Sequence, residues 1–374
     1  MKLCVIYNFA AHYRAPVFEK IDRLFDCDWF FGKTNSDIKK MDYSLLRGNV
    51  TELNTVRYHG LTWYKGVLKL LRQKQYTHYL VFAQTKDLST WFFAVLAKLL
   101  HPKKQVYFWS HGFYGKESAG ERIIKKRMFK LPNGGTFLYN NYARDLMIEQ
   151  GLDSKKLFVI HNSLAYDEQL ATRQQLVVKP IYQEHFRNNN PNLIFIGRLT
   201  PVKKLDMILH AMSKLMANGK NYNLTFIGGG EKRDELEQLS RQLGLEKHVW
   251  FYGPCYDEKV LGEMIYNADL CVSPGNVGLT AMHTMVFGTP VLTHDDFSHQ
   301  MPEFEAIKEG VTGSFFKYGD VEALADGISR WFEEKHNKRE EVRTACMHEI
   351  DTNWTPQFQL NVLTSVIKPK NNVG

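Results

Sequence analysis

Short apolar runs alternate with amphipathic stretches along the first 160 residues. The apolar runs predict strands at Leu3–Tyr7, Asp28–Phe31, His78–Ala83, Gln105–Trp109, Gly135–Tyr139 and Leu157–Ile160. Apolar residues at helical spacing predict helices at about Pro16–Leu24, Tyr64–Gln73, Leu88–Leu100, Ala119–Phe129 and Asn141–Gln150. Strands that are apolar at nearly every position are typical of a sheet buried on both faces. The pattern therefore predicts a parallel, doubly wound α/β sheet.

The same alternation returns after a polar segment, Leu164–Pro191, in which we expect a boundary between domains at 1–170 and 171–351. Two doubly wound, Rossmann-like domains facing a central cleft are expected, because open α/β sheets bind ligands at their carboxyl edges. We expect the last helix, at about 352–370, to pack back on the first domain. The second set of strands and helices is predicted at Leu193–Ile196, Leu205–Met216, Asn223–Ile227, Arg233–Leu243, His248–Tyr252, Asp257–Tyr266 and Val321–Phe332.

One stretch of the second half, Ala268–Leu292, has the pattern of an anion site. It reads as a buried strand, a turn at Pro274–Asn276, a helix from about Gly278 and a second strand. Backbone N–H groups are free at the start of a helix, where the helix dipole also favours an anion. Taken alone, the stretch fits an ordinary βα turn equally well.

Positive charge is concentrated in the first half of the chain. The net charge is +8, but residues 1–180 hold 28 Lys and Arg against 15 Asp and Glu, while the remainder holds 20 against 25. A basic half indicates an anionic partner, such as a phospholipid surface, a polyprenyl diphosphate or nucleic acid. No basic-aromatic platform is evident, so we expect no nucleic-acid partner.

Five scattered cysteines without a CxxC pair favour a reducing compartment and argue against structural zinc. The first residues read as a strand and not as a signal peptide. The longest apolar run, from Trp91 to Leu100, is half a membrane span and contains Lys98. We expect a cytoplasmic protein, with contact to the inner face of a membrane left open.

The motifs from Asn192 onward resemble those of a known protein family. NLIFIGRLTPVKKLDMILHAM, LTFIGGGEKRDELEQLSRQLGL, HVWFYGP, YNADLCVSPG and EGVTGSFF follow one another at the spacing of a donor domain. In this order they resemble the glycosyltransferases of family 4, over about Asn192–Phe332 and more loosely before it. The resemblance implies a GT-B fold and transfer of a sugar from a nucleotide diphosphate donor with retention of configuration. It implies no cofactor and no metal.

Arg198 and Lys203 match the basic residues of that family and follow a predicted strand. A departing nucleoside diphosphate gains negative charge, so preorganised cations are the chemical requirement. The alternative is two solvated surface cations. The resemblance also places Gly197 and the turn containing Gly229 and Gly230 beside the nucleotide, although a tight βα turn explains a glycine run as well.

The chain departs from the family at two positions. The family carries two glutamates eight residues apart, one near the donor sugar and one on the ribose, and here these positions are Gly275 and His283. Asn276 is a candidate for the missing sugar contact, and His283 for a weaker ribose contact or a core residue. The retained Gly278, Leu279 and Thr280 offer backbone amides to the diphosphate.

In the first domain, Trp109–Gly112 resembles the cleft histidine motif of the family, and His111 is the candidate catalytic residue of this half. It would orient the donor sugar or stabilise charge; the alternative is a polar residue at a strand end. His12, Tyr13 and Arg14 would meet an acceptor. The basic stretch Glu121–Lys130 would lie on an anionic membrane or remain a solvated helix face.

Two acidic motifs are poor metal candidates. Asp26–Asp28 matches the D-x-D of metal-dependent transferases, but it lies far from any nucleotide turn. His294–Asp296 ends a strand and more plausibly forms a polar loop. Glu305 matches a family glutamate without an assigned role.

These patterns favour a glycosyltransferase that adds a sugar to a glycan on a lipid carrier, as in capsule or O-antigen synthesis. The acceptor rests on family analogy and charge. The alternatives are a catalytically lapsed homologue acting as a membrane or complex partner, which the missing glutamates favour, and a GT-B nucleotide-sugar epimerase, which would need more carboxylates.

Overall fold

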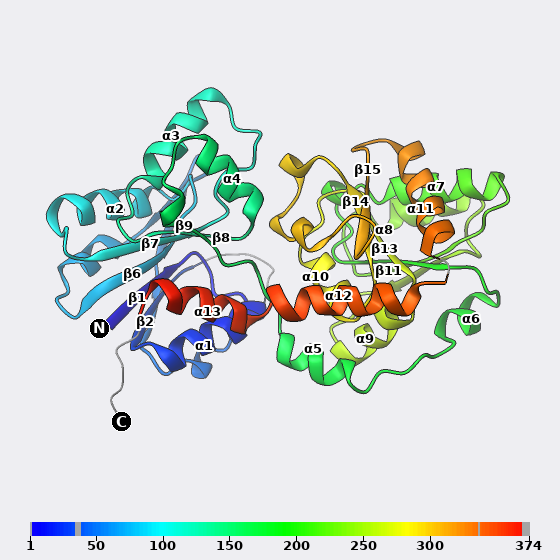
Figure 1. Ribbon diagram of the computed structural model, residues 1–374, viewed down its shortest axis with the longest axis horizontal. Helices are drawn as coiled ribbons and strands as arrows, with labels where there is room; N and C mark the ends of the chain where they lie inside the picture. Colours follow the sequence, from blue (N-terminus) through cyan, green and yellow to red (C-terminus); the bar gives the residue numbers. More distant parts are fainter. Residues whose placement is uncertain (1, 34–38, 336, 369–374) are drawn as a thin grey trace. The chain divides into compact units, whose positions relative to one another are not determined.

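The computed structural model describes residues 2–33, 39–335 and 337–368. The chain divides into two compact units, the first formed by residues 1–165 with 355–374 and the second by residues 166–354. Each unit contains one parallel sheet with helices on both faces (Figure 1). This is the two-sheet, Rossmann-like α/β class that the hydrophobic pattern predicts.

The first unit is built on a seven-stranded sheet in which every neighbouring pair is parallel, in the order β3-β2-β1-β6-β7-β8-β9. Figure 1 shows α2, α3 and α4 on one face of this sheet and α1 and α13 on the other. The strands are β1 (Lys2–Tyr7), β2 (Cys27–Gly32), β3 (Val50–Leu53), β6 (Tyr76–Phe82), β7 (Gln105–Ser110), β8 (Gly135–Leu138) and β9 (Leu157–Val159). The helices are α1 (Ala15–Leu24), α2 (Leu88–Leu100), α3 (Ala119–Phe129), α4 (Asn141–Glu149) and α13 (Pro356–Val366).

The second unit has a six-stranded parallel sheet in the order β12-β11-β10-β13-β14-β15. The strands are β10 (Asn192–Ile196), β11 (Asn223–Ile227), β12 (Val249–Gly253), β13 (Leu270–Ser273), β14 (Val291–His294) and β15 (Gly313–Phe316). The helices are α5 (Tyr166–Arg173), α6 (Ile181–Phe186), α7 (Asp206–Ala217), α8 (Arg233–Gln242), α9 (Glu258–Asn267), α10 (Leu279–Val286), α11 (Val321–Lys335) and α12 (Arg339–Asn353).

Strand order sets where a ligand site can form in this second unit. The chain builds outward from β10 through β11 to β12, and then returns to the other side of β10 with β13, β14 and β15. The switch point therefore lies between β10 and β13. Loops leave in opposite directions at such a point, and the carboxyl ends of the two strands frame a crevice.

The last helix belongs to the first unit. α13 packs on α1, and Leu363 and Ile367 join the buried core around Phe18. Buried Gln359 fixes its start, because its side chain donates to the carbonyl of His161 at 2.8 Å and accepts from the Ser163 hydroxyl at 2.6 Å.

The division between the units falls after residues 165 and 354, whereas the sequence pattern placed it after 170 and 351. The difference arises because α5, at the first boundary, packs on α9 of the second unit.

The sequence-based prediction was wrong for residues 55–72, where two short strands and a 3-10 helix follow one another closely. A helix was predicted at Tyr64–Gln73; the structure instead has an antiparallel hairpin, β4 (Thr55–Tyr58) and β5 (Leu61–Tyr64), followed by the 3-10 helix η3 (Val67–Arg72). Helix α12 and strand β15 were not predicted. α12 buries Val342, Cys346 and Ile350, at four-residue spacing, together with Arg343.

Candidate active site

Two glycine-rich loops meet at the carboxyl edge of β10 and β11. A Cβ on Gly228 would lie 1.9 Å from the carbonyl oxygen of Gly197, and one on Gly230 would lie 2.4 Å from that of Leu199. The Leu199 N–H donates to the Gly229 carbonyl at 2.9 Å. Close packing of the two loops thus accounts for this glycine run, and it shapes the edge at which Arg198 is exposed.

The turn before α10 lies at the adjoining edge of β13. Gly278 is the N-cap of α10 and provides no side-chain cap. The Thr280 hydroxyl donates to the carbonyl of Ile196 at 2.8 Å, which ties the first turn of α10 to the end of β10. The structure therefore brings Gly197, Gly278, Leu279 and Thr280 together at the switch point, where the helix dipole favours an anion.

Lys203 reaches this turn from η5 (Pro201–Lys203). Its Nζ donates to the carbonyl oxygen of Asn276 at 2.7 Å and to the Asn276 Oδ1 at 2.9 Å. Burial lowers the pKa of Lys203 to about 8; the Glu303 carboxylate opposes this shift and the Arg198 charge adds to it. The structure thus brings Lys203 and Asn276 into contact, with Arg198 close enough to repel the ammonium.

Position 275 has no room for a side chain. An added Cβ would lie 2.1 Å from the Val202 carbonyl oxygen and 2.6 Å from the Lys203 Cα. The Gly275 N–H donates to the Lys203 carbonyl at 3.0 Å and holds the two segments together. Both contacts are with backbone, which yields less readily than a side-chain tip.

His283 lies on α10 and faces a carboxylate of its own. Its Nε2 is 3.0 Å from Glu258 Oε1 on α9, and both side chains are largely buried. Burial raises the pKa of Glu258, but the hydrogen bond and charge of His283 outweigh it and hold that pKa below its usual value. A glutamate at 283 would set two carboxylates against each other, so the environment of this position favours histidine.

Glu303 is a carboxylate of this site that the sequence reasoning missed. It is buried in η7 (Pro302–Ala306), and its Oε2 lies 4.0 Å from the Cβ position of Gly278. Nearby Gln300 accepts a hydrogen bond from the Val277 N–H at 2.7 Å, which anchors this loop to the turn. The sequence drew attention to Glu305 instead; the structure buries Glu303 together with Pro302, Phe304 and Ala306.

His111 follows β7 in the first unit and lies among aromatic rings. Its ring centroid is 4.6 Å from that of Tyr139 and 6.1 Å from that of Tyr114. Burial, with the nearby charges of Arg14 and Lys125, lowers the pKa of His111 to about 4. At neutral pH His111 is therefore a neutral hydrogen-bonding group and not a cation.

Two predicted surface cations are instead internal to the first unit. Arg14 is buried and donates to the Tyr139 hydroxyl at 2.9 Å, so it supports the wall behind His111 and does not project to an acceptor. Lys125 is also buried; its Nζ donates to Glu117 at 2.5 Å and to the Gly112 carbonyl at 3.1 Å. The prediction that Lys125 lies on a membrane-facing surface of α3 was wrong, because it closes the loop after His111.

The two acidic motifs are engaged locally. Asp28 accepts hydrogen bonds from Tyr76 at 2.6 Å and Asn49 at 3.1 Å, and Lys2 is 3.0 Å away. Asp295 accepts from the Tyr318 N–H and Asp296 caps a 3-10 turn. Within residues 2–33, 39–335 and 337–368, no three His, Cys, Asp or Glu side chains are grouped to hold a metal ion.

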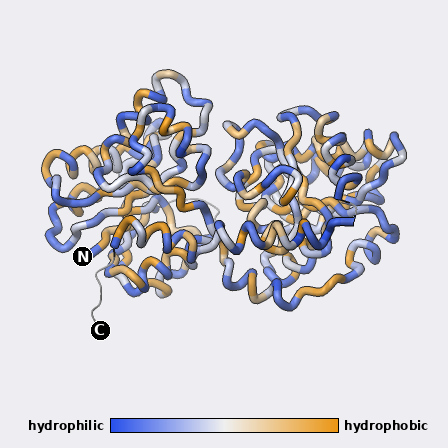
Figure 2. The backbone as a smooth tube through the Cα atoms, in the orientation of Figure 1, coloured by the Kyte–Doolittle hydropathy of each residue, from blue (hydrophilic) through white to orange (hydrophobic). Residues whose placement is uncertain are grey.

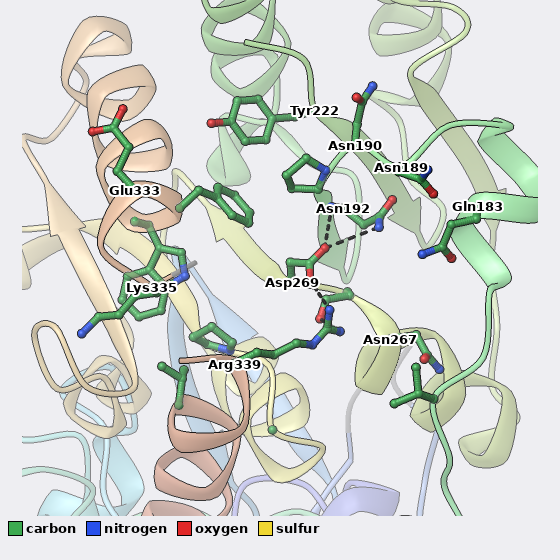
Figure 3. A pocket seen from close by; sticks show the side chains of 18 of the residues that line it. Gln183, Asn189, Asn190, Asn192, Tyr222, Asn267, Asp269, Glu333, Lys335 and Arg339 are labelled. Carbon is green, nitrogen blue, oxygen red and sulfur yellow. Dashed lines mark hydrogen bonds and ion pairs between the residues drawn. The ribbon is translucent and has the colours of Figure 1, made fainter. Parts of the chain in front are cut away.

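A pocket of the second unit lies at the opposite edge of its sheet. Its volume is about 580 Å³, and its lining includes Asn192 and Asp269 at the amino ends of the strands (Figure 3). Asp269 accepts from the Asn192 N–H at 2.8 Å and pairs with Arg339. A second pocket of about 560 Å³ includes Thr200 and Lys204, next to the candidate site. We place the candidate site at the carboxyl edge of the sheet and not at either pocket, because Arg198, Lys203 and the N-terminus of α10 lie at that edge.

Residues 180–346 match the family model described as glycosyl transferases group 1. An uncharacterized glycosyltransferase of Methanocaldococcus jannaschii is 29% identical over 171 residues, which is 45% of this chain and 40% of that protein. The putative glycosyltransferase EpsD of Bacillus subtilis is 28% identical over 164 residues, 41% of each protein. The match thus spans about two fifths of the length of these relatives.

Solved structures resemble the chain over nearly its whole length. The lipopolysaccharide outer core galactosyltransferase WaaB has a TM-score of 0.72 at 15% identity, covering 98% of this chain and 100% of that one. HepE of Anabaena in complex with UDP-glucose has a TM-score of 0.70 at 15% identity, covering 98% and 99%. At this identity the likeness establishes the GT-B fold, while the family model matches less than half of the chain.

We expect Gly275→Ala to lower the free energy of unfolding of the second unit by about 2 kcal/mol or more, because its Cβ would meet the backbone of Val202 and Lys203. Gly275→Glu, which places a larger side chain at the same position, should be at least as unstable. Chemical denaturation followed by tryptophan fluorescence measures both. Gly120→Ala is the matched control, since nothing lies within 4 Å of a Cβ there. A wild-type unfolding curve for Gly275→Ala would contradict the packing argument.

Proposed function

We propose that this protein is a retaining glycosyltransferase that moves a sugar from a nucleotide diphosphate donor to a lipid-linked glycan acceptor. The observation that carries the proposal is the arrangement of Lys203, Asn276 and the α10 N-terminus at the switch point, with Arg198 exposed beside it. Such a site offers two cations and helix amides to a diphosphate.

The proposed chemistry needs charge stabilisation above all. The bond from the sugar C1 to the diphosphate oxygen breaks, and C1 bonds to an acceptor hydroxyl oxygen on the same face. The hydroxyl proton moves to the departing diphosphate. Arg198 and Lys203 stabilise the negative charge that develops on the leaving group, and neutral His111 is assigned to hydrogen bonding of the donor sugar. No metal or cofactor enters this scheme.

The proposal assigns the remaining nucleotide contacts to residues of the switch point and the adjoining loops. Leu279 and Thr280 supply amides to the diphosphate, and Gly197, Gly229 and Gly230 allow backbone to approach it. Asn276 and His283 are assigned to the sugar and ribose. His283 would bring Glu258 with it, because the two side chains are hydrogen-bonded.

The acceptor proposal rests on similar proteins and on charge. WaaB is named a lipopolysaccharide outer core galactosyltransferase, and HepE was solved with UDP and with UDP-glucose. A Streptomyces coelicolor relative at 28% identity is named an exopolysaccharide phosphotransferase. Surface polysaccharide synthesis at the inner face of a membrane, with an anionic lipid surface as a peripheral partner, accords with the basic first half. No helix among the residues that the structure describes is long and apolar enough to cross a membrane.

A second candidate function is a lapsed homologue that binds partners without turnover, which the replacement of both motif glutamates favours. The two functions differ in a single observable, since only the transferase releases nucleoside diphosphate from a nucleotide sugar.

A thermal-shift panel of UDP, GDP, ADP and their sugars should identify the donor, because a ligand that binds only the folded protein raises its melting temperature. With that donor, Arg198→Ala and Lys203→Ala should each lower turnover by about 10²-fold or more, the scale for losing one charge-stabilising contact. Lys220→Ala is the control, since Lys220 pairs with Glu333 away from the turn. Near wild-type rates in both variants would rule out the diphosphate assignment, and binding without release would favour the lapsed homologue.

Nucleoside diphosphate affinity should fall as pH rises through about 8, because Lys203 then loses its proton. Glu303→Gln removes the carboxylate that raises the pKa of Lys203, so the fall in affinity should begin at lower pH. The other two nearby groups, Arg198, which lowers this pKa, and Cys271, which raises it, are unchanged in the variant. Below pH 7 the variant should bind as well as wild type. Calorimetric titration from about pH 6.5 to 9.5 measures this, with Glu305→Gln as the matched control. Superimposed profiles for Glu303→Gln and wild type would exclude the coupling.

A further inference from the structure

The hairpin β4–β5 turns an apolar face outward. Val56 pairs with Trp63 and Tyr58 with Leu61, so these four side chains share one face of the two-stranded sheet. Tyr58 is 72% exposed, Val56 42% and Leu61 40%. The opposite face carries Tyr64, which is buried toward the body of the unit. A solvent-facing hairpin surface is ordinarily the polar one.

Helix α2 continues this apolar surface. The rings of Trp63 and Phe92 are in contact, with centroids 5.5 Å apart. Phe92, Leu99 and Leu100 are spaced seven and eight residues apart on one side of the helix and are 52%, 71% and 66% exposed. The other side of α2, with Phe93, Ala94 and Ala97, fills the core. In Figure 2 the tube of α2 is coloured mainly as hydrophobic.

Cations are frequent in the segment that forms this hairpin–α2 face, which comprises Val56, Tyr58, Leu61, Trp63, Phe92, Leu99 and Leu100. Residues 54–104 contain nine Lys and Arg and one acidic residue, Asp87. Asp87 is buried, and the preceding acidic residue, Glu52, is paired with Lys40. Lys65, Lys69, Lys86, Lys98 and Lys103 are exposed. The exposed charge of the segment is therefore entirely positive.

We propose that the hairpin–α2 face docks the first unit on an anionic lipid surface. Tyr and Trp are the side chains that favour the boundary between water and acyl chains, and exposed Leu and Phe gain by entering it. Surrounding Lys and Arg side chains meet the lipid phosphates. A second copy of this chain fits less well, because a symmetric interface would set the same cations against one another.

This inference extends the membrane contact of the proposed function and moves it from α3 to a different surface. On α3 the central cation, Lys125, is buried in an ion pair, which leaves Arg122 and Arg127 exposed. The docking does not depend on the chemistry at Lys203, so the two can fail separately.

The test is co-sedimentation of the full chain with vesicles of phosphatidylcholine alone or mixed in equal parts with phosphatidylglycerol. We expect binding to the mixed vesicles only, and release by salt. Tyr58→Ser with Leu99→Ser and Leu100→Ser should weaken binding by about tenfold or more. Lys65→Glu with Lys69→Glu and Lys103→Glu should weaken it by about 10²-fold. All six positions are exposed, and nucleotide-dependent melting shifts should stay as in wild type, which shows that the fold and the donor site are intact.

Matched controls separate this face from others. Val177→Ser with Val178→Ser removes two exposed apolar side chains of the second unit and should leave binding unchanged. Arg122→Glu with Arg127→Glu should weaken binding only slightly. Equal binding to neutral vesicles, no binding at all, or release by the α3 pair but not by the hairpin–α2 variants would each overturn the proposal. So would a wild-type dimer in sedimentation velocity that the Tyr58, Leu99 and Leu100 changes dissociate.

Discussion

The backbone of Val202 and Lys203 lies directly against Gly275, and much of the candidate site depends on this contact. The hydrogen bond from the Gly275 N–H to the Lys203 carbonyl fixes it, and the Lys203 side chain then reaches Asn276 in the same turn. An added side chain at 275 would meet this backbone, so the close approach of Lys203 to the turn before α10 requires glycine at this position.

Because of that contact, the carboxylates near α10 come from neighbouring elements. Glu258 on α9 meets His283, and Glu303 in η7 lies beside Gly278. Each is coupled to a basic side chain: Glu258 to His283 by a hydrogen bond, and Glu303 to Lys203 through its charge, which raises the pKa of that lysine.

The parallel sheets could be predicted because their strands are apolar at successive positions, and the switch point follows once strand order is assumed. The hairpin could not be predicted, because Tyr64, Val67, Leu68 and Leu71 have the spacing of one helix face. In the structure the chain turns at Gly66. Sequence could place Arg198 and Lys203 after a strand, but not Glu303, because a carboxylate in sequence looks solvated until its neighbours bury it. The prediction for Lys125 was wrong because a lysine in a basic stretch looks solvated in the sequence. Only the fold shows which of the adjacent cations points inward, and Lys125 pairs with Glu117.

The return of α13 to the first unit has a consequence for how the protein is made. Leu363 and Ile367 belong to the same core as Leu3 and Val5, and Gln359 satisfies groups at His161 and Ser163. A growing chain has completed the second unit before these residues leave the ribosome, so the unit whose synthesis begins first is the last to close its core. Until then the α1 surface that α13 covers stays open to water and to chaperones, and a chain that stops before Thr355 never acquires a complete first unit.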